Sequence, residues 1–89
     1  MPVYMVERKL ENISMDELSG AQAAAIDKAA ELTASGVSMR YIRSTFVPGD
    51  GRCMCLFEGP SEQAVKQLND DIQVPYEKVT PAFDLTPAD

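Results

Sequence analysis

The alternation of hydrophobic and polar positions predicts a strand and then a long helix in the first half of the chain. Residues 3–8 have an apolar centre, which is typical of a strand buried on both faces. Ser14 and Glu17 have the spacing of a capping box, and alanines with larger apolar residues follow at helical spacing. Gly36 fits the position just past a helix end. We therefore expect a strand over 3–8 and a helix over 15–34.

The second half of the chain predicts a hairpin, a helix and a last strand. Strand-like segments over 37–47 and 52–58 flank the turn residues 48–51, which are Pro-Gly-Asp-Gly. A Gly-Pro-Ser sequence ends the second of these strands and caps a helix over 62–72. A final strand is expected over 76–84. The predicted order of elements is therefore β-α-β-β-α-β.

This order defines the expected fold class, which is α+β and ferredoxin-like. In this βαββαβ arrangement, a four-stranded antiparallel sheet in the order 4-1-3-2 carries two helices on one face. We expect a single domain over residues 1–85 and a short C-terminal tail over 86–89. The sheet face without helices needs water or another subunit to cover it. The pattern therefore favours a dimeric assembly that resembles an α/β barrel.

The turn at 48–51 assigns side chains to the two faces of the predicted hairpin. A four-residue loop places Arg43 opposite Leu56, and Tyr41 opposite Glu58, all on one face. The opposite face carries no charge, so we assign it to the core beneath the helices; its residues are Ile42, Ser44, Phe46, Cys53, Cys55 and Phe57. The first face mixes apolar and charged residues, which is typical of a surface that packs on a second subunit.

Two interpretations of this mixed face remain open. In one, Arg43 and Glu58 form an ion pair at a dimer interface. In the other, the two subunits enclose a small polar cavity that binds a ligand through Tyr41, Arg43 and Glu58. Glu7 is the other carboxylate close to the sheet and is a further candidate ligand-binding residue. Because the first and third strands are antiparallel, Glu7 and Glu58 should lie near opposite ends and form no acid–base pair.

Cys53 and Cys55 are candidates for a metal site. In a strand they share one face about 7 Å apart, which is poor geometry for a mutual disulfide. Thiolates suit copper(I) or zinc, but the chain has only two cysteines and no histidine to complete a larger set. Packing in the core is the alternative, since a free cysteine behaves as a small hydrophobic residue.

Composition narrows the possible functions. The 89 residues carry a net charge of −6, which argues against nucleic acid or anionic membranes as partners. The absence of histidine excludes Ser-His and Cys-His nucleophile pairs and imidazole zinc sites. We assign no catalytic residue. No apolar run reaches the length of a signal peptide or membrane span, and the cysteine spacing suits a reducing compartment, so we expect a cytoplasmic protein.

Three segments together resemble a known bacterial family. They are residues 1–8 (MPVYMVER), 40–47 (RYIRSTFV) and 53–58 (CMCLFE). The family consists of small nickel-responsive or nickel-binding proteins that were formerly catalogued as a domain of unknown function. The resemblance spans about residues 2–85 and lies in the ordered set of segments rather than in one motif. It implies a ferredoxin-like fold, a homodimer and a divalent metal, nickel, as a possible cofactor.

Two positions separate this chain from proteins that it resembles. Arg43 stands where many relatives carry a histidine, and the histidine that some carry in the second helix is also absent. A guanidinium cannot ligate a metal ion, whereas nickel(II) favours imidazole or other nitrogen and oxygen ligands. Arg43 would instead favour an anionic ligand such as a carboxylate or phosphate, or an ion pair with Glu58.

Three functional hypotheses follow. The first is a homodimeric binding protein that holds a small ligand or a divalent metal ion at the sheet face or subunit interface. The second is a purely structural dimer. The third is a cofactor-free enzyme of the dimeric α/β-barrel kind, an isomerase or monooxygenase, in which Tyr41, Arg43 and Glu58 act as acid, clamp and base; only fold analogy supports it.

Overall fold

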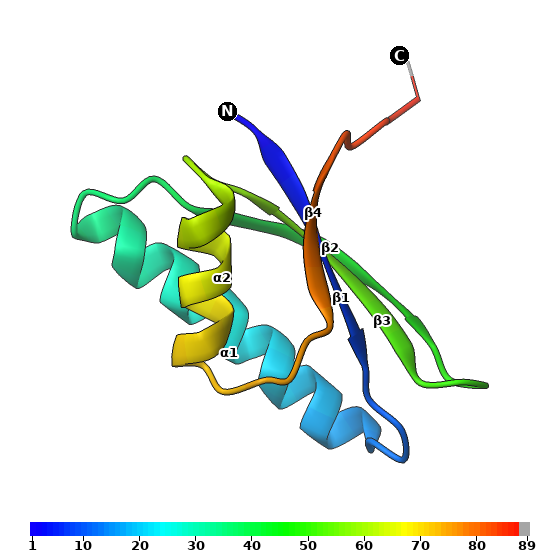
Figure 1. Ribbon diagram of the computed structural model, residues 1–89. Helices are drawn as coiled ribbons and strands as arrows, with labels where there is room; N and C mark the ends of the chain where they lie inside the picture. The colour runs from blue at the N-terminus through cyan, green and yellow to red at the C-terminus, as the bar shows by residue number, and fades with distance from the viewer. Residues whose placement is uncertain (88–89) are drawn as a thin grey trace.

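Four antiparallel strands form one open sheet, and both helices cover the same face of it (Figure 1). The computed structural model describes residues 1–87. The elements follow in the order β1 (Val3–Lys9), α1 (Met15–Ala34), β2 (Arg40–Val47), β3 (Arg52–Glu58), α2 (Glu62–Asp71) and β4 (Lys78–Ala82). The strands lie in the order β2-β3-β1-β4. The expected ferredoxin-like fold and its 4-1-3-2 sheet are confirmed. Of the expected C-terminal tail, residues 88–89 lie outside the described residues.

The helix boundaries agree closely with the sequence pattern, whereas two strands are shorter than expected. The Ser14 hydroxyl accepts a hydrogen bond from the Glu17 amide, and the Glu17 carboxylate accepts one from the Ser14 amide, both at 3.0 Å. This capping box starts α1 where predicted. β2 begins at Arg40 instead of residue 37, because Met39 donates its backbone N–H to the Thr33 hydroxyl rather than to a strand. Within residues 1–87, no helix has the length and apolar character needed to cross a membrane.

The hydrophobic core lies between the sheet and the helices. Alternate residues of β1 and β3 point into it, as the period of a strand requires. The largest side chains that are fully enclosed there are Phe57, Leu68, Val6 and Val65. Arg8 follows the same alternation, since it lies two residues beyond Val6, and its side chain enters the core with only 4% of its surface exposed.

Two hydrogen bonds hold the Arg8 guanidinium against α2 and the segment that follows it, and the one to Asn69 is buried. Its Nη2 donates to Asn69 Oδ1 at 2.7 Å, and its Nη1 donates to the Val74 carbonyl at 3.3 Å. The Asn69 amide in turn donates to the Val65 carbonyl at 2.8 Å, so its side chain is fixed in both directions. These contacts join the central strand β1 to α2 and to the segment that follows it.

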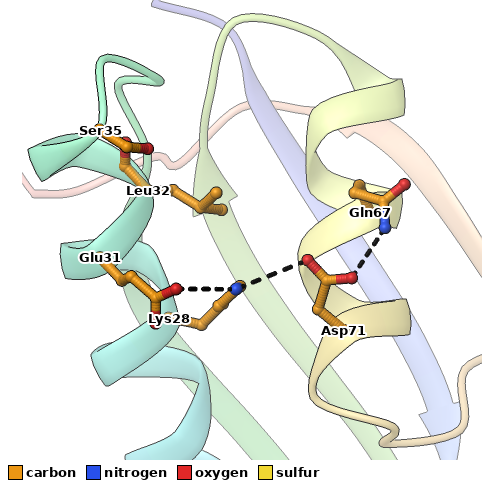
Figure 2. A network of polar contacts seen from close by, with 6 residues as sticks. All are labelled: Lys28, Glu31, Leu32, Ser35, Gln67 and Asp71. Carbon is orange, nitrogen blue, oxygen red and sulfur yellow. Dashed lines mark hydrogen bonds and ion pairs between the residues drawn. The ribbon is translucent and has the colours of Figure 1, made fainter.

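A polar network joins the two helices at the outer surface (Figure 2). Lys28 of α1 places its Nζ 3.1 Å from the Glu31 carboxylate and 3.7 Å from Asp71 of α2. Gln67 donates to Asp71 at 2.8 Å. The hydrogen bond with Glu31 raises the pKa of Lys28, so this side chain stays charged. Exposed pairs of this kind contribute about 0.2–1 kcal/mol each, so the core and the Arg8–Asn69 contact dominate the packing of α2.

A β-bulge at Ile42 changes the expected assignment of faces. Arg43 lies opposite Leu56, as expected, but Tyr41 lies opposite Phe57 instead of Glu58. The extra residue turns Tyr41 towards the helices, where its ring meets Phe57 edge-on with centroids 5.5 Å apart. Ile42 therefore lies on the open face, beside Glu58. The predictions that Tyr41 shares a face with Arg43, and that Ile42 belongs to the core, were wrong.

Replacing Asn69 tests the contribution of the buried Arg8 contact. We expect Asn69→Leu to lower the free energy of unfolding by about 3 kcal/mol, because it leaves a buried guanidinium without its closest acceptor. Urea unfolding followed by circular dichroism measures this change. Gln67→Leu, at an exposed position of the same helix, is the control and should stay within about 0.5 kcal/mol of the wild type. Equal effects of the two substitutions would contradict this role for Asn69.

Candidate functional site

A cavity of about 170 Å³ lies between α1 and the sheet. Most of its wall is apolar and comes from the loop after β1, from α1, from β2 and from the segment after α2: Leu10, Leu18, Ala21, Ala25, Phe46, Ile72 and Val74. Six side chains with polar atoms or thiols complete it: Arg8, Gln22, Tyr41, Ser44, Cys53 and Cys55. An apolar cavity with a few converging polar groups is the usual form of a small-ligand site.

The polar side chains of this cavity form a directed chain of hydrogen bonds. Gln22 Nε2 donates to the Tyr41 hydroxyl at 3.1 Å, and the Tyr41 and Ser44 oxygens lie 2.5 Å apart. Ser44 Oγ donates to Cys55 Sγ at 2.9 Å. A serine hydroxyl has one hydrogen, so Tyr41 must be the donor in its contact with Ser44. The hydrogen bonds therefore all point in one direction, from Gln22 on α1 through two hydroxyls on β2 to the Cys55 sulfur. The last of them stabilises a negative charge on that sulfur.

Cys53 and Cys55 lie side by side in the cavity wall, with their sulfur atoms 3.8 Å apart. Arg8 lies directly opposite Cys53 on the neighbouring strand β1. The hydrogen bond from Cys53 lowers the pKa of Cys55 to about 6, and the Arg8 charge and the Ser44 hydroxyl act in the same direction. The same contact with Cys55, together with burial, raises the pKa of Cys53. At neutral pH the pair therefore holds one proton between two sulfurs.

The opposite face of the sheet carries the charged residues that the sequence singled out. Glu7 of β1 pairs with Lys78 of β4, with Oε2 and Nζ 3.3 Å apart. Glu58 pairs with Arg40, with Oε1 and Nε 3.4 Å apart. The expected pair between Arg43 and Glu58 is not formed, because the bulge brings Arg40 directly opposite Glu58. Each of these contacts spans neighbouring strands of the sheet.

Arg43 instead pairs with Asp84, which lies in the segment after β4. The Asp84 carboxylate is mostly buried, whereas the Arg43 side chain is about half exposed. Asp84, Glu58 and Arg40 border a groove of about 570 Å³ on this face. Arg43 therefore has a carboxylate partner at the edge of that groove.

The structure divides the four predicted ligand-binding residues between the two sides of the sheet. Arg43 and Glu58 lie on the open face, and Glu7 lies on the same face towards the other end of β1, as expected from the antiparallel pairing. Tyr41 lies on the helix side and belongs to the cavity with Cys55. Sequence reasoning also missed Arg8 as a site residue, although the alternation of residues along β1 places it on the core side.

The residues present do not form a nickel site within one chain. The sequence has no histidine. Among residues 1–87, no group of three or more His, Cys, Asp and Glu side chains could hold a metal ion. Cys53 and Cys55 provide two donors, whereas nickel(II) in a tetragonal site requires more.

The fold and the cavity define a small ferredoxin-like α+β protein, and its sequence places it in a family. Residues 4–81 match the family described as "Nickel responsive protein SCO4226-like", and the chain belongs to this family. The crystal structure of SCO4226 from Streptomyces coelicolor A3(2) is similar, with a TM-score of 0.78 and 19% identity. The alignment covers 94% of this chain and 99% of that one. The comparison with curated proteins gave no match.

The ionisation of Cys55 can be measured directly. We expect the thiolate absorbance at 240 nm to rise with pH and to reach half of its one-thiolate amplitude near pH 6, because the pKa of Cys55 is lowered to about 6. In Cys53→Ala the midpoint should move upward, since the Cys53 hydrogen bond is the largest cause of the lowered pKa. Cys55→Ala is the control and should lose this transition. A wild-type midpoint near 8.5, the ordinary thiol value, would contradict the assignment.

Proposed function

We propose that this chain is a homodimeric binding protein whose subunits pair through the open faces of their sheets and hold a small anionic ligand between them. The observation that carries this proposal is the composition of the open face. Val3, Met5, Ile42 and Leu56 form its apolar centre, and each is half-buried in the single chain. A second copy of the same face would remove this apolar area from water.

The charges of the open face also favour pairing. Glu7, Glu58 and Arg43 each have a partner of opposite sign within the chain. Removing an ion pair from water costs less than removing an isolated charge, so the face can be covered by a partner without leaving unpaired charges. A domain of 89 residues has a small core, and association is a common way to add buried surface.

The pair between Arg43 and Asp84 supports an anion as the ligand. Asp84 already provides a carboxylate to the Arg43 guanidinium at the edge of the groove. The half-exposed Arg43 guanidinium has further N–H donors, so a carboxylate or phosphate of a ligand can bind it beside Asp84. The Glu58 carboxylate borders the same groove, so we expect the ligand to carry a hydrogen-bond donor that can contact Glu58.

Nickel and catalysis receive less support from the geometry. The family description contains the words nickel responsive, but the donor set of this chain does not fit nickel, and we derive no step through it. The enzyme hypothesis required Tyr41, Arg43 and Glu58 to act on one substrate. The bulge places Tyr41 on the other side of the sheet from the two charged residues, so the three cannot converge.

Dimerisation can be tested with a matched pair of methionine substitutions. We expect Met5→Glu, in the centre of the open face, to weaken dimerisation at least about 100-fold, because a buried unpaired carboxylate costs several kcal/mol. Sedimentation equilibrium should give about twice the 9.7 kDa chain mass for the wild type and a single chain mass for Met5→Glu.

The control is Met15→Glu, which changes an exposed methionine at the start of α1 and should leave the dimer intact. Circular dichroism checks that each variant keeps its helices. A wild-type chain that remains monomeric at millimolar concentration would refute the proposed dimer.

Ligand binding can be tested by thermal shift with inorganic phosphate and with citrate. We expect each anion to raise the Tm of the wild type by several degrees, as ligand binding to the folded state does. The rise should disappear in Arg43→Gln and persist in Arg52→Gln, which removes an exposed arginine of the β2–β3 hairpin that pairs with Asp50. Any general effect of added salt on Tm should be the same in the wild type, Arg43→Gln and Arg52→Gln, so the comparison isolates binding at Arg43. A wild-type Tm that does not respond would instead favour the purely structural dimer.

A further inference from the structure

The geometry of the inner cavity points to a second site: we propose that Cys53 and Cys55 bind one copper(I) ion between their sulfur atoms. This site lies on the helix side of the sheet, away from the open face, and does not depend on the dimer. Both thiols are buried, with 2% and 6% of their residues' surface exposed, and both line the cavity of about 170 Å³. The cavity gives an ion a route to the sulfurs.

The number of available donors selects the class of metal. The two thiols stand alone, because no group of three or more His, Cys, Asp and Glu side chains in residues 1–87 could hold a metal ion. Zinc in proteins takes four ligands, and nickel(II) favours tetragonal or octahedral sets. Copper(I) is soft, selects thiolates and is stable with two of them. A site with only two sulfur donors therefore suits copper(I) and leaves zinc and nickel with too few ligands.

The charge of Arg8 selects a monovalent ion. Two thiolates, one copper(I) and the Arg8 guanidinium sum to zero net charge. A divalent ion in the same place leaves an uncompensated positive charge in an apolar cavity, which is costly. Within residues 1–87, Arg8 has neutral hydrogen-bond acceptors, Asn69 and Val74, but no carboxylate partner. The copper(I) bis-thiolate carries a charge of −1, which is the charge of the singly protonated pair of thiols, so exchanging that proton for copper(I) leaves the charge beside Arg8 balanced.

Binding at this site is a substitution without electron transfer. One bond forms from copper to each sulfur, the remaining thiol protons leave to the solvent, and copper stays in its +1 state. With metal–sulfur bonds of about 2.3 Å, the present 3.8 Å between the sulfurs corresponds to an angle of about 110° at the metal. A linear arrangement requires the sulfurs to separate by less than about 1 Å, and the cavity beside them leaves room for this movement.

The hydrogen-bond chain from α1 fixes one of the two ligands. Ser44 Oγ donates to the Cys55 sulfur at 2.9 Å, and Tyr41 holds Ser44 from the other side at 2.5 Å. Groups that hydrogen-bond a metal ligand orient it and tune its charge, and their loss typically costs about 10–100-fold in metal affinity. Ser44 is therefore a positioning residue in this site.

The test is an anaerobic titration of tag-free protein with copper(I) in competition with a chromophoric copper(I) chelator. We expect one copper(I) per chain in the wild type and no 1:1 binding in either Cys53→Ala or Cys55→Ala. Ser44→Ala should bind about 10–100-fold more weakly. Thr45→Ala, which changes an exposed side chain on the adjacent position of β2, is the control and should bind as the wild type does. X-ray absorption should show two sulfur neighbours around copper.

Parallel titrations with zinc(II) and nickel(II) are expected to give no stoichiometric binding. Met5→Glu, which breaks the proposed dimer, should keep its copper(I) affinity, so failure of the dimer and failure of the copper site can be told apart. Circular dichroism checks that the alanine variants remain folded. Cys53→Ser removes the same thiol but keeps a side chain of similar size, and it should also fail to bind copper(I). Equal copper(I) binding by the wild type and both cysteine variants, or stoichiometric zinc(II) or nickel(II) at these thiols, would overturn the proposal.

Discussion

Burial of the Arg8 charge is the constraint on which the inner side of this protein depends. A guanidinium with 4% of its surface exposed must receive hydrogen bonds and counter-charge from its neighbours. Asn69 and the Val74 carbonyl provide the hydrogen bonds, and this fixes α2 and the following segment over β1. The Cys53 and Cys55 thiols provide the group that can become negative. Arg8 therefore connects the stability of the fold with the chemistry of the cavity.

The order of elements was predictable from the sequence because its signals are local. The capping box at Ser14 and the turn at 48–51 fix where elements start and where the chain reverses, whatever packs against them. The β-bulge at Ile42 has no such signal. Tyr41 and Ile42 are both large and can each occupy a core position, so the hydrophobic pattern is satisfied in either register. The hydrogen bond that Tyr41 accepts from Gln22 and its contact with Phe57 favour one register, and both partners come from distant parts of the chain.

The candidate site was predictable to a similar extent. Arg43 and Glu58 were correctly placed on the open face, because the length of the hairpin turn fixes the pairing of β2 with β3 as far as Arg43 and Leu56. Glu7 was correctly expected near the other end of the sheet from Glu58. Their ion-pair partners were not predictable. Asp84 reaches Arg43 from the segment after β4, and no spacing in the sequence reports a contact between residues 41 positions apart.

Alternate residues of β3 line two separate surfaces, the inner cavity and the open face, so each surface can be changed by mutation without changing the other. Cys53 and Cys55 point to the cavity, whereas Met54 and Leu56 point to the open face. A substitution at Cys53 or Cys55 alters what the cavity can hold. A substitution at Met54 or Leu56 alters what the open face can contact. Point mutations along this strand can therefore change the lining of the cavity while the open face keeps its composition.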